Sequence, residues 1–270
     1  MTALSINLGA VLALVRRDAK IFISYRFRFA TQLVSTFFGL VLFYYLSRIV
    51  GHNVFHTSNE YFAFAVIGLT VMEVLGATLA ALPLSLRQEL VAGTFERLVL
   101  SPFGAIGAVA SMMVFPFLLS AVSALITLTL ATLVFGMNLA WSTAAYAIPV
   151  ALLGAAAFAP FSLLIAASVL SVKQAGAGAG FFVTGISLIG GFFFPVSLLP
   201  SWIRWASDVQ PFTPALQLLR HLLVGTPATS SAWLTVAKLA GFAVVLVPAS
   251  LVVLHRAIRF AQRRGTIIEY

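Results

Sequence analysis

Six apolar stretches, each long enough to cross a lipid bilayer, constrain the fold of this chain more than any other feature. A helix of about 20 apolar residues spans the hydrocarbon core. Only 9% of the residues are charged, whereas soluble domains carry about 25%. The sequence therefore predicts an all-α membrane protein in which residues 1–270 form a single transmembrane domain. The expected transmembrane helices are residues 30–46, 61–84, 105–135, 144–170, 176–194 and 233–254.

The positions of Lys and Arg predict how these six helices are oriented. Twelve basic residues fall on the side that carries both termini and the connection between the second and third spans, and four fall on the other side. Because cytoplasmic loops are rich in Lys and Arg, we expect both termini in the cytoplasm. The net charge of +9 lies at these membrane borders, so it indicates contact with anionic lipid headgroups rather than nucleic acid.

The N-terminal segment, residues 1–29, combines an apolar face with a basic face. Leu8, Val11 and Leu12 follow helical spacing, and Arg16 and Lys20 lie on another side of the same helix. This pattern predicts a helix lying at the cytoplasmic interface of the membrane. The alternative is a basic flank that only fixes orientation.

Residues 85–103 form the longest charged interruption between two expected spans. Spans one and two lie before it, in residues 30–84, and spans three to five follow it, in residues 104–194. We expect a short cytoplasmic helix that pairs its charges with a partner while Phe95 and Leu98 fill an apolar pocket on that partner. The alternative is a solvated loop whose ion pairs contribute little. The charged residues are Arg87, Glu89, Glu96 and Arg97.

Residues 195–232 are too interrupted for a span and too apolar for a free loop. Four prolines break the segment, and irregular backbone near a membrane requires cover from protein or a water-filled cavity. We expect two short helices, residues 201–209 and 213–224, that dip back into the outer leaflet before the last span (233–255) and a cytoplasmic tail (256–270). The alternative is an amphipathic outer loop. The prolines are Pro195, Pro200, Pro211 and Pro214.

Glu73 lies deep inside the second expected span. An ionisable residue at that depth is a functional candidate by default and needs a partner, for which Arg48 and Lys238 are the candidates. The functional interpretation is a polar site on a substrate path or a proton relay. The structural interpretation, which we favour slightly, is a hydrogen-bonded carboxyl that holds neighbouring helices together.

Motifs for ATP binding, metal binding and nucleophilic catalysis are missing from the sequence. It contains no Gly-x4-Gly-Lys-Ser/Thr loop, and the AGAGAG run at 175–180 indicates close helix packing instead. His52 and His56 have no third ligand nearby, so we do not expect zinc. With no cysteine and no nucleophile-base pair, we expect no enzyme activity in this chain. His221 is expected to cap helix carbonyls.

Two motifs resemble signatures of the type-2 ABC exporter permeases. The first reads Glu-x3-Gly-Thr-x-Glu-Arg-Leu-x2-Ser-Pro and runs from Glu89 to Pro102. The second motif comprises Gly191, Phe194, Pro195, Leu199, Pro200, Trp202, Pro211, Arg220 and Gly225. Both motifs fall in the order and at the places expected among six spans, so the resemblance covers nearly the whole chain.

The resemblance, closest to the drug and small-lipid exporter permeases, implies that residues 85–103 form a coupling helix seated on a separate ATPase. It further implies two copies of an ATP-binding ABC subunit that carry ATP and Mg, no cofactor in this chain, a second permease chain that is identical or similar, and a location in the plasma (inner) membrane. The implied coupling residues are Arg87, Glu89, Gly93, Thr94, Phe95, Glu96, Arg97 and Leu98. The implied outer-gate residues are Pro195, Pro200, Trp202, Pro211 and Arg220.

The expected function is therefore export of a hydrophobic or amphipathic substrate, such as a drug, lipid or glycolipid. One alternative is a proton-coupled secondary transporter that uses Glu73. It is disfavoured because the sequence contains no convincing inverted repeat. Another is a membrane-embedded transferase acting on lipid, for which the sequence offers no convergent polar site beyond Glu73 and the outer Arg residues.

Overall fold

In the computed structural model, residues 8–49, 55, 57–99, 104–172, 176–227 and 230–264 are described. All regular secondary structure within these residues is helical, which confirms the all-α prediction. The elements are α1 (Leu8–Ser24), α2 (Arg26–Ile49), α3 (Ser58–Val91), α4 (Phe95–Val99), α5 (Gly104–Ser111), α6 (Val114–Leu133), α7 (Trp141–Val172), α8 (Gly176–Ile189), the 3-10 turn η1 (Val196–Leu198), α9 (Ser201–Val209), α10 (Phe212–Val224) and α11 (Ala232–Arg264).

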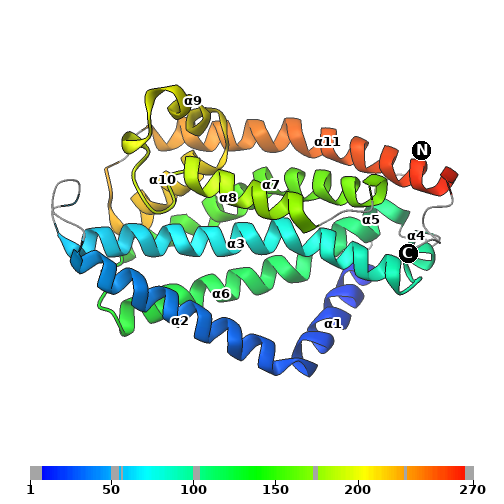
Figure 1. Cartoon of the computed structure of the whole chain (residues 1–270), viewed down its shortest axis with the longest axis horizontal. Helices are drawn as coiled ribbons and strands as arrows, with labels where there is room; N and C mark the ends of the chain where they lie inside the picture. Colours follow the sequence, from blue (N-terminus) through cyan, green and yellow to red (C-terminus); the bar gives the residue numbers. More distant parts are fainter. Residues whose placement is uncertain are drawn as a thin grey trace.

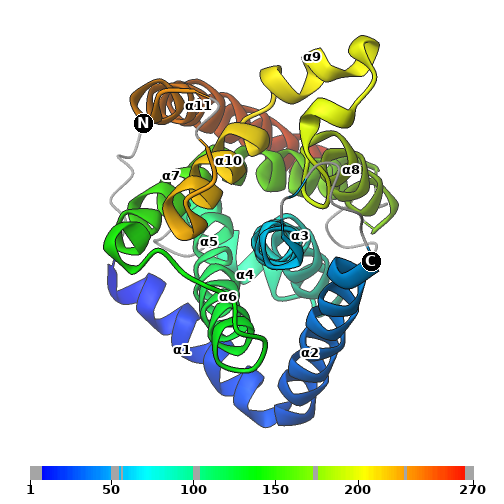
Figure 2. The same ribbon diagram turned by 90° about the vertical axis from the view of Figure 1, so that its left-hand side faces the viewer.

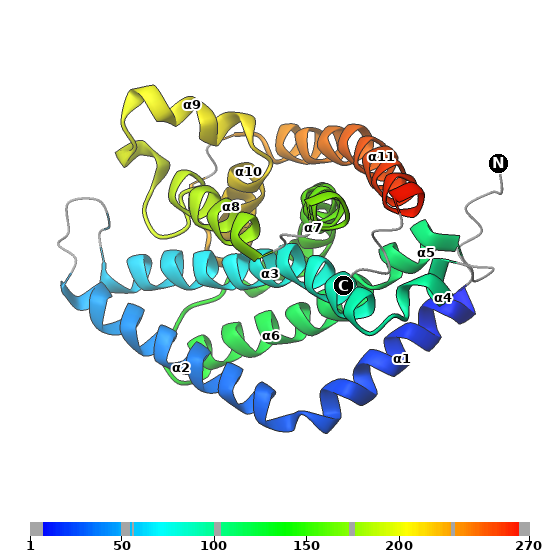
Figure 3. The same cartoon turned by 45° about the vertical axis from the view of Figure 1, so that its right-hand side comes forward.

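Helix α3 forms the centre of the bundle. Viewed end-on in Figure 2, it lies between α1 and α2 on one side and α7, α10 and α11 on the other. Its apolar side chains are buried along most of its length, including Phe62, Leu75 and Leu82, each with no exposed surface. The long helices α7 and α11 pack closely side by side and complete one wall of the bundle (Figure 3).

Five helices are long and apolar enough to cross a membrane, and the expected count of six is not confirmed among the described residues. The fifth expected span, residues 176–194, yields only the 14-residue helix α8. At about 1.5 Å per residue this helix covers about 21 Å, short of the core of about 30 Å. Gly191, with φ of +73°, lies in the turn that follows α8. The candidate spans are Ala30–Ile49, Ser58–Val91, Ile106–Leu133, Trp141–Leu170 and Ala232–Arg263.

Helix α1 is separate from the bundle core and meets α2 at a sharp bend beside Tyr25 (Figure 1). None of its residues is buried, which fits an amphipathic helix that covers the bundle rather than entering it. The bend brings the first turns of α1 next to α5, at the same end of the molecule as α4.

Helices α9 and α10 begin and end within one residue of the bounds expected from the sequence. They lie at the end of the bundle where α3 begins, whereas α4 lies at the opposite end (Figure 1). Helix α10 packs against α7 and α3, and α9 lies at the surface. The two ends of the molecule thus carry the two groups of predicted functional residues.

Candidate functional site

The expected coupling segment is a corner between two helices rather than one helix. Helix α3 continues to Val91, a tight turn follows, and α4 begins at Phe95. The turn closes because Gly93 N–H donates to Leu90 O at 3.1 Å and Thr94 N–H donates to Glu89 O at 3.0 Å. Gly93 has φ of +65°, a conformation that L side chains rarely adopt. Sequence residues 100–103 lie outside the described residues.

Glu89 is held inside the chain instead of facing outward. One carboxylate oxygen pairs with Arg17 of α1 at 2.8 Å, and the other accepts a hydrogen bond from the Thr94 hydroxyl. Burial lowers the pKa of Arg17, but its hydrogen bond with Asp18 and the charges of Glu89 and Asp18 outweigh that effect and raise the pKa overall. The pair joins residues 72 positions apart, so it was not found from the sequence.

Phe95 has no exposed surface, and this corrects the expectation that it fills a pocket on a partner. Its ring lies in a core cluster shared by α3, α5, α7 and α11, with Leu86 and Leu254 among its members. Leu98 is partly buried against the same cluster. The outward surface of the corner is therefore mixed, with Arg87, Gln88 and Arg97 exposed beside the apolar side chain of Val91, which is 62% exposed. The side chain of Glu96 lies outside the described part of the structure.

Glu73 joins three helices through two hydroxyl groups. Thr36 of α2 donates to one carboxylate oxygen at 3.0 Å. The Thr127 hydroxyl of α6 lies 3.3 Å from the other oxygen and shares its single proton between that oxygen and Ser123 O at 2.9 Å. The predicted partners are wrong. Arg48 donates to the Tyr44 hydroxyl at 2.8 Å, and Lys238 lines a cavity at the end of the bundle. The contacts match the structural interpretation of a carboxyl that holds helices together.

Arg220 is the most constrained of the predicted outer-gate residues, with only 3% of its surface exposed. Its guanidinium lies 3.3 Å from the centroid of the Phe64 ring. It donates to Phe64 O at 3.0 and 3.2 Å, to Gly191 O at 2.8 Å and to Phe192 O at 2.6 Å. Arg220 thereby ties α10 to α3 and to the turn after α8. Burial lowers the pKa of Arg220 to about 9, so the group stays charged at neutral pH.

Gly68 makes this junction possible. A Cβ atom at that position would lie 1.8 Å from Phe192 O and 2.9 Å from Nη2 of Arg220. Only glycine lets α3 approach the turn after α8 so closely. Gly68 was not predicted from the sequence, because close backbone approach leaves no mark on local periodicity.

The remaining predicted gate residues do not converge on one point. Pro195 lines the same cavity as Arg220. Pro200 and Pro211 directly precede α9 and α10 and act as helix starts, while Trp202 is 73% exposed on α9. Pro200 and Pro211 thus shape the local backbone, whereas Pro195 and Arg220 line the cavity.

The histidine predictions have different outcomes. His221 Nδ1 lies 2.7 Å from Thr226 O, beyond the end of α10, so it does not cap a helix carbonyl. Gly225, with φ of +71°, ends that helix instead. His52 and His56 lie outside the described residues, as do Ser101 and Pro102 of the first motif.

One known protein family matches a range of the chain that includes both ends of the molecule. The family model described as ABC-2 type transporter matches residues 9–224, which is most of the chain. The matched range contains the corner around Glu89 and the junction around Arg220. No curated protein matches the chain.

Proposed function

Because the chain belongs to the ABC-2 type transporter family, we propose that it is the membrane-spanning permease subunit of an ATP-driven exporter. Members of this family are transport subunits that work with ABC ATPase partners. In the proposal, two ATPase copies carry ATP and Mg, and one of them binds at the α3–α4 corner of each permease chain. The exported substrate is hydrophobic or amphipathic, as expected for a drug, lipid or glycolipid.

The packing of Phe95 is the observation that carries this proposal. The residue fixes the five-residue helix α4 to a core shared by α3, α5, α7 and α11. A partner that displaces α4 would therefore move the adjoining parts of α3, α5, α7 and α11 with it, because closely packed cores resist deformation. The Arg17–Glu89 pair adds α1 to the same mechanical unit.

The partner would meet a positively charged surface with one exposed apolar side chain, Val91. Arg87 and Arg97 are exposed at the corner, and an acidic groove on the ATPase would suit them. Such rim charges set orientation and association rate more than affinity.

A second permease chain, identical or similar, belongs to the proposal for a geometric reason. Helix α3 occupies the centre of the bundle, and Leu75, Leu79 and Leu82 on it are completely buried. The middle of the bundle is therefore filled, so a substrate path would run along the interface between two such chains.

The test is purification in mild detergent from the native cell, with identification of co-purifying proteins. We expect an ABC ATPase with the wild type and its loss in the double variant Arg87→Glu/Arg97→Glu. The matched control is Arg259→Glu/Arg263→Glu, which makes the same charge change at exposed positions on α11. Equal retention in both variants, or no ATPase with the wild type, would contradict the proposal. Proton-coupled transport would need no such partner.

A further inference from the structure

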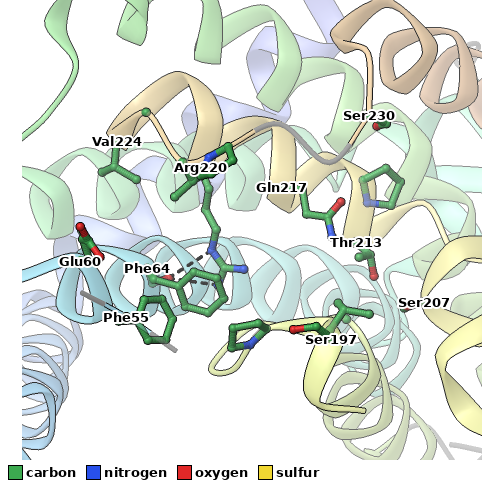
Figure 4. A pocket seen from close by; sticks show the side chains of 18 of the residues that line it. Phe55, Glu60, Phe64, Ser197, Ser207, Thr213, Gln217, Arg220, Val224 and Ser230 are labelled. Carbon is green, nitrogen blue, oxygen red and sulfur yellow. Dashed lines mark hydrogen bonds between the residues drawn. The ribbon is translucent and has the colours of Figure 1, made fainter. Parts of the chain in front are cut away.

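A cavity of about 1040 Å³ is lined by residues at the end of the bundle remote from α4 (Figure 1), and Figure 4 shows its lining from close by. Its walls come from the first turns of α3, the segment after α8, α9, α10 and the beginning of α11. This volume is at the upper end of the range of about 300–1,000 Å³ that is typical of small-molecule sites. The lining is predominantly polar in character near α10, where Thr213 and Gln217 point into it.

The deepest charge in the cavity wall is positive. Arg220 is 3% exposed, and its four hydrogen bonds all end on backbone carbonyls. These bonds occupy four of its five N–H groups, which leaves one on Nη1. The ion pairs recorded among described side chains join Arg17 to Asp18 and Glu89, so none of them neutralises Arg220.

Two further cations lie in the wall nearer to solvent. Arg204 is anchored there because one nitrogen donates to Ser197 O at 2.7 Å and to Leu199 O at 2.9 Å. Lys238 of α11 lines the cavity and is exposed. The two carboxylates of the lining, Glu60 and Asp208, are both exposed. The buried part of the cavity is therefore positive and the rim is mixed.

Apolar side chains form the rest of the lining. Phe55 packs edge-on against Phe64, with ring centroids 5.2 Å apart, and both rings line the cavity. Val196 and Val224 lie on the other walls. A ligand that combines an acidic group with an apolar part would match both features of this lining.

We infer that this cavity is a binding site for the acidic group, a phosphate or a carboxylate, of an amphipathic ligand. Arg204 and Lys238 attract the group, Arg220 supplies the positive field at the bottom, and Phe55 and Val196 contact the apolar part. The role of the site in transport, as the place that a substrate occupies on the outer side, rests on the proposed export function. Binding itself does not, because it needs neither ATP nor the ATPase.

The experiment measures binding of radiolabelled dodecyl phosphate to the full-length chain in phosphatidylcholine nanodiscs, with empty nanodiscs subtracted. We expect Arg204→Gln/Lys238→Gln to weaken binding by roughly tenfold, as expected for the loss of charges within a few ångström of a phosphate. We expect Asp208→Asn to strengthen binding, because it removes a carboxylate from the same rim. The control is Arg48→Gln, which removes an exposed cation that does not line the cavity.

Three outcomes would overturn the inference. Equal weakening by Arg48→Gln would mean that general surface charge attracts the probe. Tighter binding of dodecyltrimethylammonium than of dodecyl phosphate would make the cavity a cation site. If inorganic phosphate displaced the probe at the same concentration as unlabelled dodecyl phosphate does, the apolar wall would contribute nothing to affinity. Failure of the export proposal would instead appear as no ABC ATPase co-purifying with the wild type, while this binding stays unchanged.

Discussion

At the scale of single residues, the junction of Gly68, Phe192 and Arg220 is closely packed, and Arg220 of α10 donates hydrogen bonds to backbone carbonyls of α3 and of the turn after α8. The backbone of α3 touches the turn after α8, and a buried guanidinium fills the remaining space. Removing a partner from a buried charged group leaves that group unsatisfied, which is more destabilising than losing an exposed contact. The junction therefore tolerates little change in volume.

We expect Gly68→Ala to lower stability by about 1–3 kcal/mol or more, because the added methyl group overlaps a backbone carbonyl that cannot move freely. The matched control is Gly76→Ala on the same helix, where a Cβ atom would meet nothing within 4 Å. Since alanine favours helices over glycine, that control should be neutral or stabilising. Thermal unfolding in detergent, monitored by size-exclusion chromatography, measures the unfolding midpoints of the two variants. Equal midpoints for the two variants would contradict the proposed close contact.

Glu73 gives a second prediction at this scale. Glu73→Gln retains an oxygen that can accept from Thr36 or Thr127, so we expect assembly and transport to be preserved. Glu73→Ala removes the acceptor of the Thr36 hydroxyl, while Thr127 keeps Ser123 O, and should lower stability by about 1–2 kcal/mol. Transport in vesicles and thermal unfolding are the measurements. A transport defect in the folded Gln variant would favour a proton relay over a helix clamp.

At the scale of elements, α4 shows how a short helix acquires a mechanical role. Five residues make an unstable helix in isolation, so its position depends on tertiary packing. The packing comes from Phe95, which is completely buried, while Arg97, two residues further along the same turn, is exposed. One face of α4 thus belongs to the bundle and the other is available to a partner.

We therefore expect Phe95→Ala to lower stability by about 3–5 kcal/mol, because it opens a cavity in the core below α4. Since the ring faces inward, the variant that remains folded at low temperature should still co-purify with the ATPase but should couple ATP hydrolysis to transport poorly. The readout is the ratio of transport to ATPase activity. Loss of the ATPase from the folded variant would instead place Phe95 in the interface between the two proteins.

The elements differ in how far local sequence determines them. Helices α9 and α10 were predictable because Pro200 and Pro211 fix where each begins. The end of α8 was not, because an apolar run through Gly190 and Gly191 reads as a continuous span. The partners of Glu73 and the Arg17–Glu89 pair were also missed, since they depend on which helices become neighbours in space.

At the scale of the whole molecule, the two ends of the bundle have different chemistry. One end carries the cavity, the helices α9 and α10, and exposed tryptophans at the first turns of α7 and α11. The other end carries α4 and the basic residues at the end of α11. Tryptophan favours membrane interfaces and Arg favours the cytoplasmic side. The cavity end is therefore expected to face outward.

This orientation can be tested directly, because the chain contains no cysteine. We expect Ser201→Cys, at the start of α9, to react with a membrane-impermeant maleimide in intact cells. Gln262→Cys, near the end of α11, should react only after permeabilisation, since the basic residues around it hold that end in the cytoplasm. Both side chains are exposed, so accessibility within the protein does not separate them. The reverse labelling pattern would show that the molecule has the opposite orientation in the membrane. The cavity would then face the cytoplasm and would be an entry site instead of an exit site.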